Sequence, residues 1–357
     1  MTTSGDLIQT NEDIYGGWVI VGASTASLGP PELQEHEATT TTTTTITTLS
    51  LSPLPVRPHH FPIDQRQLDA QRLSHLAVCE LLRGELHLAD LKKAEKPIRR
   101  VLDVGSGEGK KAPVTNNFYR RLMGDLLQDA EHCNEFADDH PDMEVIGTDL
   151  SAIGDTWGPP NLRFEIEDCR QDWTFDDSRF DFIHMRDLVG GIKDWLRLFR
   201  EAFRCTSPGG LIESHEHSFI FQSDNKSIEP GSALGWMGKI FMEAGDKTGY
   251  SFAVVDEGVQ KERMEEAGFV DINEEVKRMS ISQKHEDPRL REISLIAYKA
   301  LLHDLEGRLL YVTTQILRWP EKQTSFFAME VREQLKRMDV YVAHKIVVGR
   351  KPESGSN

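Results

Sequence analysis

The chain has 357 residues, of which 38% are hydrophobic and 28% charged, and its formal net charge is −17. This length allows one large domain or two ordinary ones, and the composition is that of a globular protein with some disorder. The acidic balance, without any basic block, argues against direct nucleic-acid binding. No apolar run approaches the roughly 20 residues that span a bilayer, so we expect no membrane association.

Four widely spaced cysteines form no CxxC motif. This pattern favours reduced thiols over a disulfide framework or a zinc site. The first residues, MTTSGDLIQTNED, lack the basic and apolar regions of a secretory signal. We therefore expect an intracellular protein, cytoplasmic or nuclear, and we assign no metal ligands.

Residues 1–57 are predicted to form a disordered N-terminal tail. They contain a threonine tract from Thr39 to Thr48, interrupted only by Ile46, and the proline-rich stretch SPLPVRP. Threonine alone cannot build a hydrophobic core. Residues 353–357 are predicted to form a second, short tail.

Between residues 62 and 90 the pattern changes to apolar residues at helical spacing, which include Leu68, Leu73, Leu76 and Leu81. This spacing predicts a helix, and Gly84 is its expected stop. Two roles stay open for a helix before the first strand: it could cover a ligand pocket or simply pack on the core.

The stretch VLDVGSGEG, residues 101–109, reads as a buried strand that ends in a glycine-rich turn. Asp103 stands at the end of this strand, and Gly105, Gly107 and Gly109 follow it. The stretch lacks the first glycine and the Ser or Thr of a P-loop, and Lys110 replaces the last glycine of a dinucleotide motif. The remaining pattern, D-x-G-x-G-x-G, suits S-adenosylmethionine (SAM), which has no pyrophosphate. An ordinary strand and turn with three glycines remains the alternative.

The next strand, MEVIGTDLS, ends in Asp149. An acidic residue at this place binds ribose hydroxyls and is expected about 20 residues after the glycine turn. Here Asp149 lies 40 positions beyond Gly109, so roughly 20 residues are extra, and residues 110–134 form an atypical insertion. An apolar stripe up to Phe136 still predicts a helix, although this helix need not begin at the glycine turn.

Strands and helices alternate through the rest of the chain, which indicates a doubly wound α/β sheet. The stretch NLRFEIEDCRQDW predicts a third strand that ends in Asp168 and Cys169, where a polar side chain can reach an adenine ring. The stretch RFDFIHMRDLVGGI predicts a fourth strand, whose tip carries Met185 and Arg186 toward the same crevice.

The fifth strand, LIESHEHSFI, places His215 and His217 on one face. Without a third ligand nearby, we interpret them as structural or pocket-lining histidines. Two late strands, FVDINEEVKRMSI and YVAHKIVVGRKP, are separated by helices predicted over 288–318 and 320–338. A final strand pair is typical of methyltransferases and is not expected of a dehydrogenase. The helical segment 285–338 is predicted to cap a substrate pocket, with a dimer contact or plain core as alternatives.

Over residues 60–352 the chain resembles the LaeA-like fungal SAM-dependent methyltransferases. The resemblance lies in phrases that occur in order, namely LLRGELHLA, VLDVGSGEG, EFADDHPDMEVIGTDLS, WGPPNLRFEIEDC, FDFIHMRDLVGGIKDW, LFREAFRCTSPGG, EAGFVDI, DPRLREI and VVGRKP. It implies one methyltransferase domain over residues 58–352 with a class I, Rossmann-like fold and a late antiparallel strand pair. It also implies SAM as methyl donor, and a role in fungal secondary metabolism or its regulation.

By position, the resemblance assigns SAM contacts to nine residues: Asp103, Gly105, Gly107, Gly109, Asp149, Asp168, Cys169, Met185 and Arg186. The chain departs from the family pattern in the insertion, which a short unspliced intron could encode. The sulfonium of SAM is already a strong leaving group, so a base is needed only for a nucleophile that carries a proton. His184, His215 and His217 are the nearby candidates, and no catalytic residue is assigned.

Two other functions remain open. A non-catalytic methyltransferase-like regulator would keep the fold, lose SAM affinity through the insertion, and act through protein partners. A nicotinamide-dependent oxidoreductase is disfavoured by Lys110 and by the late strand pair. For the enzyme, the acceptor is expected to be a small molecule or a protein, and the sequence names neither it nor the methylated atom.

Overall fold

The structure is a computed structural model that describes residues 65–94, 96–107, 132–150, 158–283 and 285–353. The chain divides into two units, Met1–His59 and His60–Asn357, and every described residue belongs to the second. The predicted N-terminal tail, Gly109 and residues 110–131 of the insertion lie outside the described residues.

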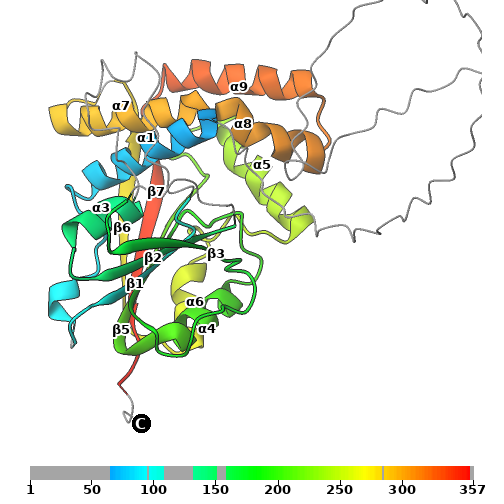
Figure 1. The fold of residues 1–357 in the computed structure, drawn as a ribbon. Coiled ribbons are helices and arrows are strands. Elements are labelled where there is room, and N and C mark those ends of the chain that lie inside the picture. The colour runs from blue at the N-terminus through cyan, green and yellow to red at the C-terminus, as the bar shows by residue number, and fades with distance from the viewer. Residues whose placement is uncertain (1–64, 95, 108–131, 151–157, 284, 354–357) are drawn as a thin grey trace, which may run out of the picture. The chain divides into compact units, whose positions relative to one another are not determined.

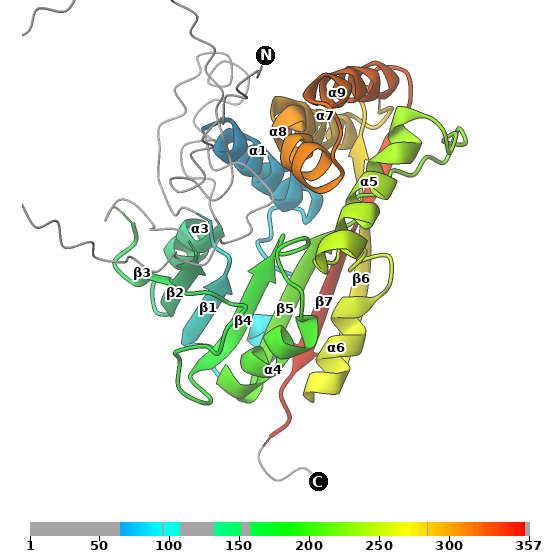
Figure 2. The same ribbon diagram turned by 90° about the vertical axis from the view of Figure 1, so that its right-hand side faces the viewer.

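Seven strands form one sheet in the order β3-β2-β1-β4-β5-β7-β6 (Figures 1 and 2). The five parallel strands are β1 (Arg100–Val104), β2 (Glu144–Asp149), β3 (Leu162–Ile166), β4 (Phe180–Arg186) and β5 (Thr206–His217). Strand β7 (Val340–Arg350) lies between β5 and β6 (Val270–Ile281) and runs antiparallel to both. This sheet confirms the predicted fold class, including the late antiparallel pair.

The central strand β4 is buried because helices and loops cover both of its faces. Phe180, Phe182, Ile183 and Met185 have no exposed surface. A parallel strand buried on two sides reads as a nearly continuous apolar run, and each such side chain contributes about 1.5–3 kcal/mol by burial. The edge strand β3 has no fully buried residue and ends at Ile166, so Asp168 and Cys169 lie in the following loop rather than at a strand end.

Two helices lie near the carboxyl end of β1. Helix α1 (Gln65–Leu81) confirms the helix predicted over 62–90, and the chain leaves it through Gly84, whose φ is +85°. Helix α3 (His132–Asp139) precedes β2 and buries Cys133 and Phe136. Helix α3 therefore corresponds to the last part of the helix that the apolar stripe up to Phe136 predicts. The short helix η1 (Leu91–Lys93) leads into β1.

The remaining helices fall into two groups. Helices α4 (Trp195–Cys205) and α6 (Val259–Ala267) contact one another beside the sheet. Helices α5 (Ala233–Thr248), α7 (Pro288–His303), α8 (Leu305–Leu310) and α9 (Glu321–Leu335) form the second group with the π-helix η3 (Tyr311–Ile316). Figure 1 shows α7, α8 and α9 beside α1 at one end of the sheet.

The helix predicted over 288–318 is divided at Asp304, the residue between α7 and α8, and its last turn is the π-helix η3. The helix predicted over 320–338 corresponds to α9. Among the described residues, no helix combines the length and the apolar character that a membrane crossing requires.

Candidate functional site

The glycine turn folds back over the end of β2. Gly105 and Gly107 have φ values of +74° and +77°, which glycine adopts without the strain that other residues incur. The N–H groups of Gly105 and Ser106 both donate to the carbonyl of Thr148, at 2.8 and 2.9 Å. A Cβ on Gly105 would lie 2.5 Å from Leu188 Cδ2. The backbone at this point is therefore fixed by two glycines and by the neighbouring strand.

The turn joins the two acidic residues that the sequence singles out. Asp149 ends β2, and its Oδ2 accepts from the N–H of Gly107 at 3.2 Å. Asp103 pairs with Gly147 across the parallel β1–β2 ladder. Both carboxylates therefore lie at the carboxyl end of the sheet, which is where the Rossmann-like interpretation expects them.

A cavity of about 740 Å³, including the part open to solvent, lies beside the glycine turn; we call it the first cavity. Four of the nine predicted SAM contacts line it: Asp103, Gly105, Gly107 and Arg186. Sequence reasoning missed further residues in its wall: Gln71, Arg72 and His75 of α1, His132 of α3, and Asp187 after β4.

Four predicted contacts stand outside the described wall of the first cavity. Asp149 reaches it through Gly107. Asp168 is paired with Arg170, whose Nε lies 2.7 Å from Oδ1. Burial raises the pKa of the Cys169 thiol to about 12, so this group is protonated. Met185 is completely buried in the core.

Two histidines contact the Asp103 carboxylate at the wall of the first cavity. Its side chain is buried, and His184 Nδ1 donates to Oδ1 at 2.6 Å while His132 Nδ1 donates to Oδ2 at 3.2 Å. The Cys133 thiol donates to the same Oδ2 at 2.7 Å. Burial by itself would raise the pKa of Asp103, but the two histidines outweigh it and hold that pKa well below its usual range.

These contacts decide which way the two imidazoles face. The rings of His132 and His184 stack with centroids 3.8 Å apart, and burial lowers the pKa of His184 to about 3. Because Nδ1 donates to Asp103, the Nε2 of a neutral ring is an acceptor. Both Nε2 atoms are buried and have no hydrogen-bond partner within the described part of the chain.

Arg186 contributes hydrogen-bond donors to the first cavity. Its Nη2 donates to His75 Nδ1 at 2.7 Å, while its Nη1 is buried and without a hydrogen bond to any described residue. An unsatisfied buried polar atom costs about 1–3 kcal/mol, so such atoms point to a missing partner. Two acceptors and one cationic donor complement the ammonium and carboxylate groups of an amino acid. The methionine part of SAM carries both, so the residues fit this cofactor.

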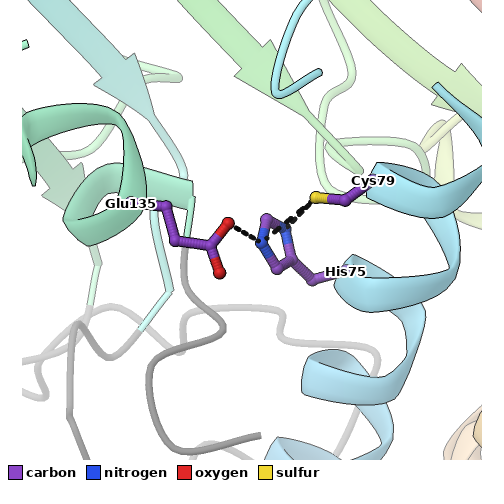
Figure 3. Close-up of side chains that lie close together, drawn as sticks. All are labelled: His75, Cys79 and Glu135. Atoms are coloured by element: carbon purple, nitrogen blue, oxygen red, sulfur yellow. Dashed lines mark hydrogen bonds and ion pairs between the residues drawn. The ribbon is translucent and has the colours of Figure 1, made fainter. Parts of the chain in front are cut away.

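Figure 3 shows a second polar group, His75, Cys79 and Glu135, in which α1 faces α3. The His75 Nε2 lies 3.1 Å from Glu135 Oε2 and 3.4 Å from Cys79 Sγ, distances that would also suit ligands of one metal ion. However, Arg186 donates to Nδ1, so Nε2 carries the proton and donates to Glu135. Burial lowers the pKa of His75 to about 4 and raises that of Cys79 to about 12. Hydrogen bonding therefore accounts for this group as a link between α1, α3 and β4.

A second cavity, of about 710 Å³ with its open part, lies among β5, β7, α5 and α7. Its polar lining residues are Ser74, His217, Ser218, Arg308 and His344. His217 Nδ1 donates to Asp187 Oδ1 at 2.9 Å, and Asp187 also lines the first cavity. The two cavities therefore meet at the Asp187–His217 pair.

The histidines of β5 have a partner that their spacing does not reveal. His215 Nε2 lies 3.0 Å from Nδ1 of His344, which is 129 positions away on β7. The His217 ring stacks on His344 with centroids 5.7 Å apart. Burial lowers the pKa of His344 to about 3, so this ring is neutral.

Comparisons with known proteins agree with this geometry. A family model described as a methyltransferase domain matches residues 73–274. Methyltransferase pytC of Aspergillus terreus is 29% identical over 296 residues, which cover 82% of this chain and 83% of pytC. Secondary metabolism regulator LAE1 of Cochliobolus heterostrophus is 27% identical over 72% of this chain and 78% of its own length.

A solved structure, that of Haemonchus contortus phosphoethanolamine N-methyltransferase 2 with SAM, matches with a TM-score of 0.41 and 17% identity, over 82% of this chain and 62% of that chain. The methyltransferase model covers more than half of the chain. The resemblance found in the sequence is thereby confirmed: the chain belongs to the methyltransferase-domain family, as a LaeA-like, class I enzyme that uses SAM as its methyl donor.

Proposed function

We propose that this enzyme transfers the methyl group of SAM to a small-molecule acceptor of fungal secondary metabolism, or acts in the regulation of that metabolism. One observation carries the proposal. Three buried polar atoms without hydrogen bonds to described residues, His132 Nε2, His184 Nε2 and Arg186 Nη1, converge on the cavity beside the glycine turn.

Each group has a role that its chemistry suggests. The two imidazole Nε2 atoms, backed by Asp103, would accept from the cofactor's ammonium group, and Arg186 would bind its carboxylate. When bound, SAM supplies an activated methyl group on a sulfonium, so the protein contributes alignment and exclusion of water.

The remaining predicted contacts complete this assignment. Gly105, Gly107 and Gly109 would let the backbone approach the cofactor, and Asp149 would accept from its ribose hydroxyls. Asp168 and Cys169 would face the adenine. We assign residues 58–352 to one methyltransferase domain, in which the helical segment 285–338 forms a cap.

A small molecule is the preferred acceptor because the second cavity is lined mainly by apolar side chains with a few polar groups among them, as ligand pockets are. The four cysteines are free, which suits a reducing compartment such as the cytoplasm or nucleus. If the protein acts in regulation, it would also have protein partners.

The test compares SAM with 5′-methylthioadenosine, which lacks the amino-acid part. In Arg186→Met we expect SAM affinity to fall about 10- to 100-fold, since a charge-assisted hydrogen bond contributes about 1.5–3 kcal/mol. Affinity for methylthioadenosine should stay within about twofold. Arg200→Met, at a surface arginine of α4 that is 61% exposed, is the control. Isothermal titration calorimetry measures both affinities for the unaltered protein and for each variant.

Equal SAM affinity in Arg186→Met would remove the proposed role of Arg186. Failure of the unaltered chain to bind SAM at millimolar concentration would remove the enzymatic function, and it would leave the non-catalytic regulator as the better interpretation.

A further inference from the structure

The second cavity has a wall suited to a flat apolar ligand. Its apolar lining includes Phe219, Phe221, Phe241, Met237, Met279 and Ile281. Aromatic and thioether side chains pack well against ring systems, and they bind a strongly hydrated molecule only weakly. The few polar groups in such a pocket usually fix the ligand's orientation.

One of those polar groups is an arginine with an unsatisfied nitrogen. The Arg308 Nε is buried and has no hydrogen-bond partner among the described residues, and the side chain lines the cavity. Burial lowers the pKa of this group, against the opposing effect of Asp187 and Asp304, yet an arginine remains charged in proteins. A buried donor without an acceptor is costly, so the site is suited to an anion.

The second polar group is a histidine held by a carboxylate. His217 Nδ1 donates to Asp187, so Nε2 of the neutral ring carries a lone pair. The His217 side chain is 21% exposed and lines the cavity, whereas Asp187 adopts a φ of +57°, which is uncommon outside glycine. Strained residues of this kind gather at functional sites. A histidine oriented by a carboxylate is a suitable general base near neutral pH.

Two further titratable groups face this pair. His344 stacks on His217 and is neutral, because burial lowers its pKa to about 3. Burial alone would raise the pKa of Asp187, but the His217 contact and Arg186 outweigh it and keep that pKa below its usual range. Asp187 is therefore ionised and can stabilise a protonated His217.

We propose that the second cavity binds a flat, apolar compound with an acidic hydroxyl group, a phenol or an enol, and that this oxygen accepts the methyl group. This inference rests on the proposed function. His217 Nε2 takes the hydroxyl proton and Arg308 binds the resulting oxyanion. The oxygen–methyl bond forms as the sulfur–methyl bond of SAM breaks, which leaves the ether, S-adenosylhomocysteine and a proton on His217.

The first test uses 4-nitrophenol, whose phenolate absorbs in the visible range, and 4-nitroanisole, its methyl ether without the acidic group. The unaltered protein, saturated with S-adenosylhomocysteine, should bind 4-nitrophenol at least tenfold more tightly than 4-nitroanisole and should increase its phenolate absorbance. Equal affinity for the two probes would overturn the proposal, and this comparison needs no variant.

The second test separates charge from shape. Arg308→Gln should weaken 4-nitrophenol binding at least tenfold and leave 4-nitroanisole within about twofold, whereas Arg308→Lys should keep most of the affinity. Arg337→Gln, at a side chain that is 78% exposed, is the control. An equal loss for both probes would show a damaged pocket instead of anion recognition, and it would count against the proposal.

The third test addresses the base. His217→Gln should slow methylation of 4-nitrophenol at a pH where the probe is protonated, and the two rates should converge where the probe is already ionised. A ratio of the two methylation rates that stays constant across pH would overturn the role of His217.

Titration of SAM into each protein tells the two hypotheses apart. SAM binding without phenol selectivity contradicts only the acceptor assignment, whereas no SAM binding contradicts the proposed function.

Discussion

At the scale of single residues, Asp103 shows how a motif residue can act through its neighbours. The sequence places this carboxylate at the strand end, where it could contact a ligand directly. In the structure its oxygens accept from His184, His132 and Cys133. The carboxylate therefore orients the two imidazole rings, whose Nε2 atoms are buried and have no hydrogen-bond partner among the described residues.

Gly105 allows the sharpest prediction at this scale. Gly105→Ala would place a Cβ against Leu188 at a positive φ, and we expect the free energy of unfolding to fall by about 1–3 kcal/mol. The displaced side chain should also weaken SAM binding at least tenfold. Denaturant unfolding and calorimetry measure the two effects.

Two other glycines serve as controls for this prediction. Gly107 also has a positive φ, but no atom lies within 4 Å of the Cβ that alanine would add. Gly107→Ala should therefore lower the free energy of unfolding without displacing Leu188. Gly231→Ala has neither feature and should change stability by no more than about 0.5 kcal/mol. If all three variants behaved alike, the conformation assigned to Gly105 would be wrong.

At the scale of elements, local patterns predicted most strands and helices because each depends on residues close in sequence. The helical spacing around Leu73 marks α1, and the apolar run from Phe180 marks β4. The sequence predicts that β3 extends to Cys169, whereas the strand ends at Ile166. An edge strand is half-exposed, so its apolar pattern does not mark where the strand ends.

The residues that the sequence did not reveal come together only through long-range packing. His344 reaches His215 through the antiparallel β5–β7 pair, and Arg308 reaches the same cavity from α8. His132 stands at the end of an insertion that hides its relation to the glycine turn. No local spacing encodes such contacts, so only the folded chain identifies them.

Glu213 of β5 links this strand to the segment between α1 and β1. Its side chain is fully buried, and Oε2 accepts from the N–H groups of Leu88 and Ala89 at 2.9 and 2.7 Å. Burial outweighs these hydrogen bonds and raises the pKa of Glu213 from 4.5 to about 7. The folded chain therefore binds this proton more tightly than the unfolded chain does.

The stabilisation from this proton is complete below pH 4.5 and is lost as the pH rises through about 7. Relative to Glu213→Gln, the free energy of unfolding of the unaltered protein should fall by about 3 kcal/mol across this range, from roughly 1.4 kcal/mol per pH unit. Urea unfolding at several pH values measures the difference between the two proteins. A difference independent of pH, or one that rises with pH, would contradict the assignment.

At the scale of the whole molecule, the two cavities share one pair of side chains. Asp187 lines the first and accepts from His217, which lines the second. In a chain with a net charge of −17, Arg72 and Arg186 line the described wall of the first cavity and Arg308 lines that of the second. A positively charged methyl donor and an acidic acceptor would therefore meet where the protein itself provides both signs of charge.

The insertion bears on this arrangement because the described residues nearest its undescribed part line the first cavity. Gly107 precedes the insertion, and His132, which begins α3, is its first described residue. Deleting residues 110–131 would bring Asp149 to within about 20 positions of Gly109, the spacing of a dinucleotide-type turn. The three links from Gly107 to His132 could then span at most about 11 Å.

We expect the shortened chain to unfold cooperatively at the same temperature, within about 2 °C, and to bind SAM at least as tightly as the full chain. Deletion of residues 1–57 is the control and should be equally neutral, because that tail lies in the other unit. Loss of SAM binding on removal of 110–131 alone would mean that the insertion is part of the site. Sequencing of the transcript supplies an independent check, since a major message that retains codons 110–134 would exclude an unspliced intron.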